Sequence, residues 1–233
     1  MTGGRELYWD GCVNVRDLGG LGRVRPRAVV RMEAPTRLSE EGWKAAWAYG
    51  VRTVVDLRNP DEREPDLAPR PAGLTNVHAP LDPVSTSFYE QWTKIDNLGS
   101  PLYYSAMLVE HPEPVVAAVR AIANAAPGCV VFHCAGGKDR TGLLTLVLLT
   151  LAGAAPDEII ADYLLTYDRM KQRYDELGFR DQLAAVTELL AARNTTIEAS
   201  LNSTITSLEM PDVLLDNGLS DTELAALHAR LTI

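Results

Sequence analysis

The sequence of 233 residues contains only three cysteines, Cys12, Cys129 and Cys134. Three cysteines are too few, and odd in number, for a disulfide framework, so we expect a reducing compartment and at least one free thiol. Basic residues are also in the minority, with 22 Lys and Arg against 31 Asp and Glu and a formal net charge of −9. Proteins whose main partner is nucleic acid need the opposite balance. We therefore expect no nucleic-acid partner, and any anionic ligand must be bound by a local site.

Long hydrophobic runs are lacking as well. The N-terminal residues MTGGRELYWDG do not have the basic-then-apolar pattern of a signal peptide. The longest apolar stretch, residues 141–156, lies between Arg140 and Asp157 and is shorter than the roughly 20 residues that a membrane span needs. We therefore expect a buried helix there, no transmembrane segment and a cytoplasmic protein, with secretion by a signal-independent route left open.

What the sequence does contain is an alternation of short apolar runs with helical patterns. Strands are predicted at residues 28–32, 51–57, 76–81 and 129–133. Helical spacing marks residues 39–49, with Ser39 as N-cap and Gly50 as stop signal, and residues 114–126. Strands separated by helices indicate βαβ units. We predict one α/β domain over residues 1–233, with three layers, a mostly parallel sheet of four to five strands and helices on both faces.

Residues 83–112 interrupt this alternation because they show no strand pattern. An insertion of this length in a compact domain is either a helical lid or a binding loop, and we expect a helical lid. After Thr141 the pattern is helical to the end, with helices predicted from Pro156 and over residues 181–192, and a capping box at Ser220 and Glu223. The apolar residues of the insertion are Phe88, Tyr89, Trp92, Tyr103, Tyr104, Met107 and Leu108.

The most informative segment is residues 130–142, VVFHCAGGKDRTG, in which a predicted strand runs into Cys134 and Arg140 precedes a helix. A loop that leads into a helix directs successive backbone N–H groups at one point, and the helix dipole adds about half a positive charge there. Gly136 and Gly137 permit positive φ and a close approach of the backbone to a ligand. The segment therefore predicts an anion-binding loop.

The residues of this loop favour attack on a phosphorus centre. A thiol facing such donors is held as the thiolate, and the Arg140 guanidinium can bind two phosphate oxygens. We predict transfer of a phosphoryl group to Cys134 and hydrolysis of the thiophosphate to inorganic phosphate, without metal or other cofactor. Thr141 and His133 would support the departing thiolate, the first by donating a hydrogen bond and the second by bracing the loop. The predicted phosphate-binding residues are Ala135, Gly136, Gly137, Lys138, Asp139 and Arg140, with Lys138 adding positive charge at the mouth.

Other interpretations of the loop fit less well. A Walker loop needs glycine where Phe132 stands and serine or threonine where Asp139 stands. A sulfurtransferase loop would not be expected to continue as G-K-D-R-T-G. A purely structural cysteine at the end of a strand is disfavoured for Cys134 by the residues around it. It is the better interpretation for Cys129, which has no basic neighbours, although a disulfide between Cys129 and Cys134 is an alternative.

The form H-C-x-x-G-K-D-R-T-G at residues 133–142 resembles the signature loop of the cysteine-dependent protein tyrosine phosphatase superfamily, and in particular the atypical bacterial tyrosine/serine and lipid phosphatases. The resemblance extends over nearly the whole chain from about residue 11. Val15 replaces the family's usual Phe and Gly136 its usual Ala, and neither change alters a catalytic atom. The supporting segments are N-V-R-D-L-G-G at residues 14–20, Arg31, V-V-D-L-R at residues 54–58 and G-L-S-D-T-E-L at residues 218–224.

The resemblance implies a tyrosine phosphatase-like fold in which Cys134 is the nucleophile and Arg140 binds the phosphate. It implies phosphotyrosine on a protein as the main substrate and leaves activity on phosphoserine and phosphothreonine open. A phosphoinositide phosphatase is an alternative, because the K-D-R loop would also suit that substrate. A catalytically inactive module that recognises phosphate is a second alternative.

Expelling the leaving group needs a proton donor, and two carboxyl groups are candidates. Asp139 lies within the motif, where this subgroup carries its catalytic acid, and Asp82 ends the last strand before the insertion. We rank Asp139 first because the motif fixes its position. Asn14, Asp17 and Arg58 are expected to be structural, with substrate contact as the alternative.

Overall fold

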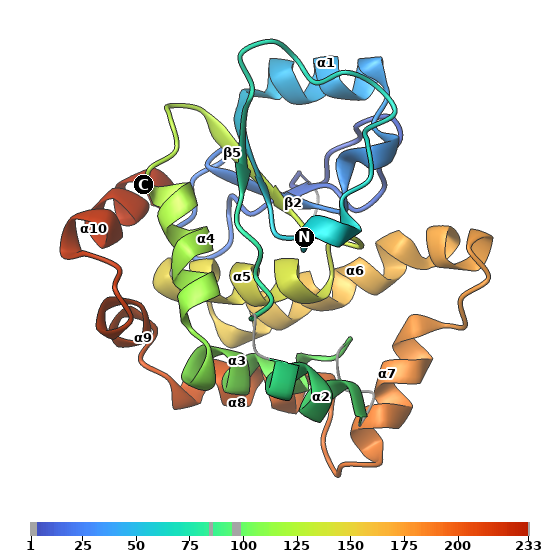
Figure 1. The fold of residues 1–233 in the computed structure, drawn as a ribbon, viewed down its shortest axis with the longest axis vertical. Helices are drawn as coiled ribbons and strands as arrows, with labels where there is room; N and C mark the ends of the chain where they lie inside the picture. The colour runs from blue at the N-terminus through green and yellow to red at the C-terminus, as the bar shows by residue number, and fades with distance from the viewer. Residues whose placement is uncertain (1–3, 84–85, 95–98, 233) are drawn as a thin grey trace.

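The computed structural model describes residues 4–83, 86–94 and 99–232. Its centre is a five-stranded sheet with the strand order β1-β2-β5-β3-β4 (Figure 1). Four strands run parallel, and β1 pairs antiparallel with β2 at one edge. This confirms the predicted α/β class and mostly parallel sheet. The strands are β1 (Arg16–Asp17), β2 (Val29–Met32), β3 (Val51–Asp56), β4 (Thr75–His78) and β5 (Cys129–His133).

The central strand β5 is buried along its whole length, because helices or loops cover both faces of the sheet. Its side chains alternate between two hydrophobic cores. Val130, Phe132 and Cys134 belong to one core, and Cys129 and Val131 belong to the other. All three cysteines are free, and Cys129 and Cys134 face opposite sides of the sheet, so the alternative of a disulfide between them was wrong.

Helices cover the two faces unequally (Figure 1). On one side, α1 (Glu40–Tyr49) packs Trp43 and Ala46 against the smaller core, begins after the predicted N-cap Ser39 and ends at Gly50, whose φ is 109°. The other side holds the larger core, which contains the predicted buried helix, α5. Besides two helices of the insertion, the helices on that side are α4 (Glu113–Ala123), α5 (Asp139–Leu151), α6 (Pro156–Glu176), α7 (Gln182–Ala191), α8 (Ile197–Ser207), α9 (Met210–Asp216) and α10 (Asp221–Leu231).

The predicted lid at residues 83–112 contributes side chains to the larger core, and its positions 84–85 and 95–98 lie outside the described residues. Tyr103, Tyr104, Met107 and Leu108, from the 3₁₀ turn η3 (Pro101–Tyr103) and α3 (Tyr104–Glu110), are core residues. The preceding helix α2 (Thr86–Lys94) lies beside α3 at the end of the molecule away from α1 (Figure 1). Phe88 of α2 is a core residue as well, so both described helices of the insertion pack on the core and a lid function stays a prediction.

The described part of the chain contains no helix with the length and hydrophobicity needed to cross a membrane. The apolar stretch after Arg140 instead forms α5, in which nearly every residue is buried. The predicted start of α6 at Pro156 and the capping box of Ser220 and Glu223 at α10 are present, and the helix predicted over residues 181–192 is α7, with Asp181 as its N-cap.

Candidate active site

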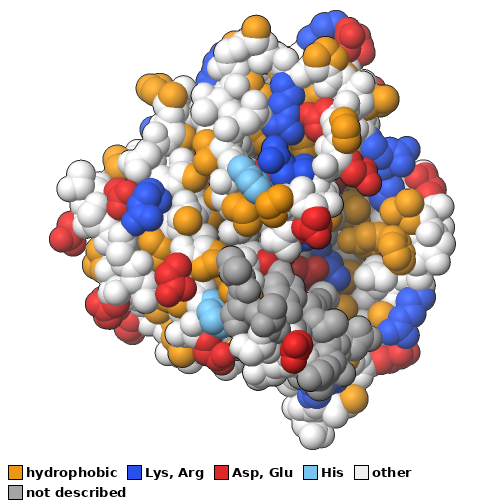
Figure 2. Space-filling view, viewed as in Figure 1, with side chains coloured by type: hydrophobic (Ala, Val, Ile, Leu, Met, Phe, Trp, Pro, Cys, Tyr) orange, Lys and Arg blue, Asp and Glu red, His pale blue; other side chains and the backbone are white. Residues whose placement is uncertain are grey.

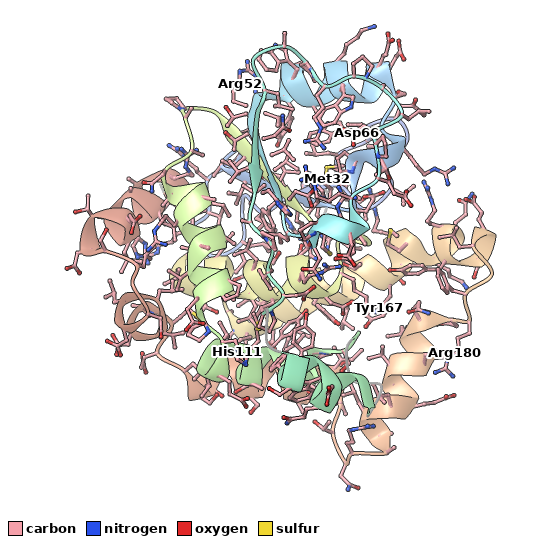
Figure 3. The ribbon with its side chains drawn as sticks, in the orientation of Figure 1. Met32, Arg52, Asp66, His111, Tyr167 and Arg180 are labelled. Atoms are coloured by element: carbon pink, nitrogen blue, oxygen red, sulfur yellow. The ribbon has the colours of Figure 1, made fainter. Side chains whose placement is uncertain are left out.

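The loop at residues 134–138 joins β5 to α5 at the carboxyl ends of the parallel strands, where ligands bind in open α/β sheets. Figure 3 labels two residues on either side of it, Met32 at the end of β2 and Tyr167 on α6. Gly137 has a φ of 67°, and a Cβ atom there would lie 2.5 Å from the Met32 carbonyl oxygen. Glycine is required here because both the positive φ and the tight contact exclude a side chain.

Every carbonyl group from Cys134 to Asp139 accepts a hydrogen bond from outside the loop. Three of the donors, Asn14, Arg31 and Ala34, come from segments more than 100 positions away in the sequence. The six contacts are His133 Nδ1 to Cys134 O (3.1 Å), Ala34 N to Ala135 O (2.9 Å), Asn14 Nδ2 to Gly136 O (3.0 Å), Arg31 Nη2 to Gly137 O (2.6 Å), Gly142 N to Lys138 O (2.7 Å) and Tyr104 Oη to Asp139 O (2.7 Å).

These contacts orient the N–H groups of the loop. The C=O and N–H of one peptide unit point in opposite directions, so carbonyls held outward at residues 134–139 direct the N–H groups of residues 135–140 inward. Within the part of the chain that the structure describes, none of those six N–H groups donates a hydrogen bond. The loop therefore presents a set of aligned backbone donors at the N-terminus of α5, as an anion-binding site requires.

Cys134 and Arg140 flank this donor set. Cys134 is 3% exposed and lies at the end of β5. The Arg140 guanidinium donates from Nη2 to Glu62 Oε1 (2.7 Å), from Nη1 to Glu62 Oε2, and from Nη1 to Asp82 Oδ2 (3.0 Å). Burial lowers the pKa of Arg140, but the bonds to Glu62 and the negative charges of Cys134 and Asp82 outweigh it and raise the pKa above its ordinary value. A cation is thus fixed beside the thiol.

The comparisons with known proteins agree with this geometry. The sequence model of the tyrosine phosphatase family matches residues 7–233. The chain belongs to the tyrosine phosphatase family. It is 31% identical over 221 residues to a protein of Cupriavidus necator provisionally named a tyrosine-protein phosphatase, covering 87% of this chain and 80% of the relative. A tyrosine-protein phosphatase of Nostoc commune is 29% identical over 228 residues, with 88% and 74% covered. The triple specificity protein phosphatase PtpB of Mycobacterium tuberculosis is 28% identical over 214 residues, with 79% and 77% covered.

A buried cluster of charged side chains lies beneath the phosphatase loop, and its contacts were not predicted from the sequence. Arg31 Nη1 donates to Asp162 Oδ2 (2.7 Å) and Arg16 Nε donates to Asp162 Oδ1 (3.0 Å), while Thr166 Oγ1 accepts from both arginines. Burial would raise the pKa of Asp162, but the two arginines hold it well below its ordinary range. The cluster fixes Arg31 against the loop and fixes Arg16 against Asn14. In the sequence, this cluster is indicated by two polar residues, Asp162 and Thr166, which lie four positions apart on the buried face of α6.

His133 braces the loop, as predicted, through the bond from Nδ1 to the Cys134 carbonyl. Burial lowers the pKa of His133 to about 4, with the Asp56 charge opposing the shift. The ring is therefore neutral at pH 7 with its proton on Nδ1.

Thr141 is fully buried, and its hydroxyl has no hydrogen-bond partner in the described part of the protein.

The two candidate acids have different surroundings. Asp82 Oδ2 accepts from Arg140 and from Asn59 Nδ2 (3.1 Å). Asp139 Oδ1 is buried and has no hydrogen-bond partner among the described residues, while its Oδ2 lies 3.7 Å from Lys138 Nζ. Burial raises the pKa of Asp139, although the charges of Lys138 and Arg140 oppose this. Asp139 therefore keeps a proton more readily than an unperturbed aspartate.

Lys138 is more enclosed than the sequence suggested. It is buried, donates from Nζ to the Gly99 carbonyl (3.1 Å) and lies 5.3 Å from the centre of the Tyr167 ring. Its ammonium therefore joins the phosphatase loop to the insertion at Gly99. Asp17 and Arg58 make structural contacts: Asp17 accepts from the Gly19 and Arg27 amides, and Arg58 pairs with Asp56.

A cavity of about 460 Å³ opens beside the loop. Ala135 and Gly136 form part of its wall, and Met170, Tyr174 and Phe179 form an apolar side. Figure 2 shows hydrophobic side chains gathered over the C-terminal part of α6, next to charged side chains of both signs. A Cβ atom on Gly136 would lie 2.8 Å from the Tyr174 hydroxyl, so alanine, which the family usually has here, would require the hydroxyl to shift. In the described residues, no group of three or more His, Cys, Asp or Glu side chains is placed to hold a metal ion.

Proposed function

We propose that this phosphatase hydrolyses phosphomonoesters through a cysteinyl phosphate on Cys134, with phosphotyrosine on a protein as its main substrate. The observation that carries the proposal is the outward fixing of six consecutive carbonyls, which aims the N–H groups of residues 135–140 at one point beside Cys134 and Arg140. Donors arranged in this way stabilise the oxygens of a phosphoryl group in the transition state without reorganising during the reaction.

In the first step the Cys134 thiolate attacks phosphorus while the loop amides and Arg140 hold the phosphoryl oxygens. The S–P bond forms and the bond from phosphorus to the ester oxygen breaks. The leaving oxygen takes a proton from Asp139. We favour Asp139 over Asp82 because burial favours its protonated form, whereas the Asp82 carboxylate is paired with Arg140.

In the second step a water molecule attacks phosphorus and the S–P bond breaks, which releases inorganic phosphate. Asp139, now a carboxylate, takes the proton from the attacking water. The thiolate leaves against the Thr141 hydroxyl, which lies seven positions after Cys134 at the start of α5 and has no other hydrogen-bond partner in the described structure. This donor stabilises the negative charge that returns to sulfur.

Phosphoserine, phosphothreonine and phosphoinositides are the alternative substrates. The relative named a triple specificity protein phosphatase supports a range wider than phosphotyrosine. The apolar wall of Met170, Tyr174 and Phe179 beside the loop favours an aromatic leaving group. We further propose a cytoplasmic location, which the three free cysteines support.

The test is hydrolysis of an aryl phosphate by the purified protein in the presence of a metal chelator and a thiol reductant. We expect turnover by the wild type and by Cys129→Ser, and none by Cys134→Ser. Cys129 is the matched control because it is a buried cysteine of the same strand on the opposite face. Binding of phosphate by the wild type without any turnover would instead support the inactive module. A panel of phosphotyrosine, phosphoserine and phosphoinositide substrates then ranks the substrate classes.

A further inference from the structure

Tyr174 places a hydroxyl group directly against the phosphatase loop. The residue belongs to α6, and its Oη is the nearest heavy atom to the position that a Cβ on Gly136 would occupy, at 2.8 Å. Among the described residues this hydroxyl has no hydrogen-bond partner. Tyr104, by contrast, donates to the Asp139 carbonyl, and the hydroxyls of Tyr163 and Tyr167 contact each other at 3.3 Å. Tyr174 is thus a tyrosine beside the loop whose hydroxyl is not used by the fold.

Tyr174 lies on the side of the loop that faces the cavity described above. The Gly136 carbonyl points away toward Asn14, whereas Tyr174, Ala135 and Gly136 together line the cavity of about 460 Å³. Burial and then the charges of Asp139, Cys134 and Glu33 raise the pKa of Tyr174 above its ordinary value. The phenol is therefore a neutral hydrogen-bond donor at pH 7.

We propose that the Tyr174 hydroxyl donates a hydrogen bond to a phosphoryl oxygen of the substrate, which makes Tyr174 a substrate-binding residue of this enzyme. This inference rests on the proposed function, since it assigns one more donor to the same phosphate site. The amides approach the phosphoryl group from the loop and Arg140 from α5, and Tyr174 adds a donor from α6. Glycine at position 136 leaves room for this hydroxyl, because a methyl group there would displace it.

Binding of inorganic phosphate, measured by titration calorimetry, tests this contact without requiring turnover. A hydrogen bond from a neutral donor to a charged acceptor is worth roughly a ten- to hundredfold change in affinity. We expect Tyr174→Phe to weaken phosphate binding by about that factor. The phenylalanine keeps the ring, which packs edge-on against Phe179 with centroids 6.0 Å apart, so thermal unfolding should be unchanged. Tyr8→Phe is the control, because Tyr8 is 80% exposed, and it should bind phosphate like the wild type.

A double-mutant cycle with Gly136→Ala separates the effect of the Tyr174 hydroxyl on phosphate affinity from the effect of the loop itself. We expect Gly136→Ala to weaken phosphate binding in the wild type and to have little further effect in Tyr174→Phe, since the methyl then meets no hydroxyl. Equal phosphate affinity of the wild type and Tyr174→Phe would overturn the proposal. So would a Gly136→Ala effect of the same size in both backgrounds. Absence of turnover by the wild type would contradict the proposed function alone, because the phosphate titration would still decide the role of Tyr174.

Discussion

Glu62 and Arg140 form a two-point ion pair in which both terminal nitrogens of the guanidinium donate to one carboxylate. Asp82 accepts from the second hydrogen of Nη1. A guanidinium has five N–H donors, so two have no partner among the described residues, one on Nε and one on Nη2. These two lie side by side along one edge of the planar group, the geometry that binds two phosphate oxygens. Glu62 therefore fixes the plane of Arg140 and leaves its phosphate-binding edge available.

Removing the Glu62 carboxylate should impair turnover more than binding. Glu62→Ala frees the guanidinium to rotate, and a misplaced catalytic group costs on the order of ten- to a hundredfold in rate. We expect kcat to fall by about that factor. KM should not rise, because a negative charge next to the anionic substrate is also lost. Steady-state kinetics on an aryl phosphate check this. Asp61→Ala changes an exposed acid in the same 3₁₀ turn, η2 (Pro60–Glu62), and should behave like the wild type. An unchanged kcat in Glu62→Ala would show that Arg140 is oriented by other contacts.

The two candidate acids can be separated by the leaving group. Loss of a general acid costs about 10²- to 10⁴-fold on a substrate whose leaving group is poor, and far less on an activated aryl phosphate. We expect this difference between substrates for Asp139→Asn, and a similar loss on both substrates for Asp82→Asn, because Asp82 contacts Arg140. If Asp82→Asn alone shows the dependence on leaving group, Asp82 is the acid.

Burial of His133 should make the protein less stable as the pH falls below 7. The pKa of His133 is lowered to about 4, from 6.5 in an unperturbed histidine, so between these values the unfolded state binds more protons than the folded state. Stability is therefore fully present above pH 6.5 and is lost as the pH falls to about 4, by roughly 3 kcal/mol in total. Denaturant unfolding of the wild type and His133→Gln from pH 7.5 to 4 measures this. Parallel stability curves for the two proteins would contradict it.

The buried cluster under the loop should be costly to break. Asp162→Asn removes the charge that faces Arg16 and Arg31 and leaves two buried cations without an anionic partner. Breaking a buried ion pair in this way typically costs about 3–5 kcal/mol, so we expect a large fall in the free energy of unfolding at pH 7. Glu188→Gln, in an exposed pair with Arg180, should change stability little. A small effect of Asp162→Asn would show that water or neighbouring groups compensate the arginines.

The parts of the site that are contiguous in the sequence could be predicted from it. The strand, loop and helix around Cys134 are encoded within residues 129–151, and each cap or glycine acts on its own neighbours. The same holds for α1 between Ser39 and Gly50 and for the capping box of α10. Local patterns fix such elements because the interactions that stabilise them span only a few residues.

The parts that depend on distant segments could not be predicted. Glu62 pairs with Arg140 across 78 positions, and Tyr174 meets Gly136 only because α6 packs beside the loop. The burial of α3 was also missed, since an apolar pattern does not say whether a helix covers the core or belongs to it. The two-residue strand β1 is too short to leave a periodic pattern.

The central claim is that phosphoryl transfer passes through Cys134. Mixing the wild-type enzyme with an aryl phosphate, quenching with acid during turnover and identifying the modified peptide by mass spectrometry tests it directly. We predict one added phosphoryl group on the peptide that contains Cys134, and none on the Cys134→Ser protein. Turnover with the phosphoryl group on a different side chain would contradict the account.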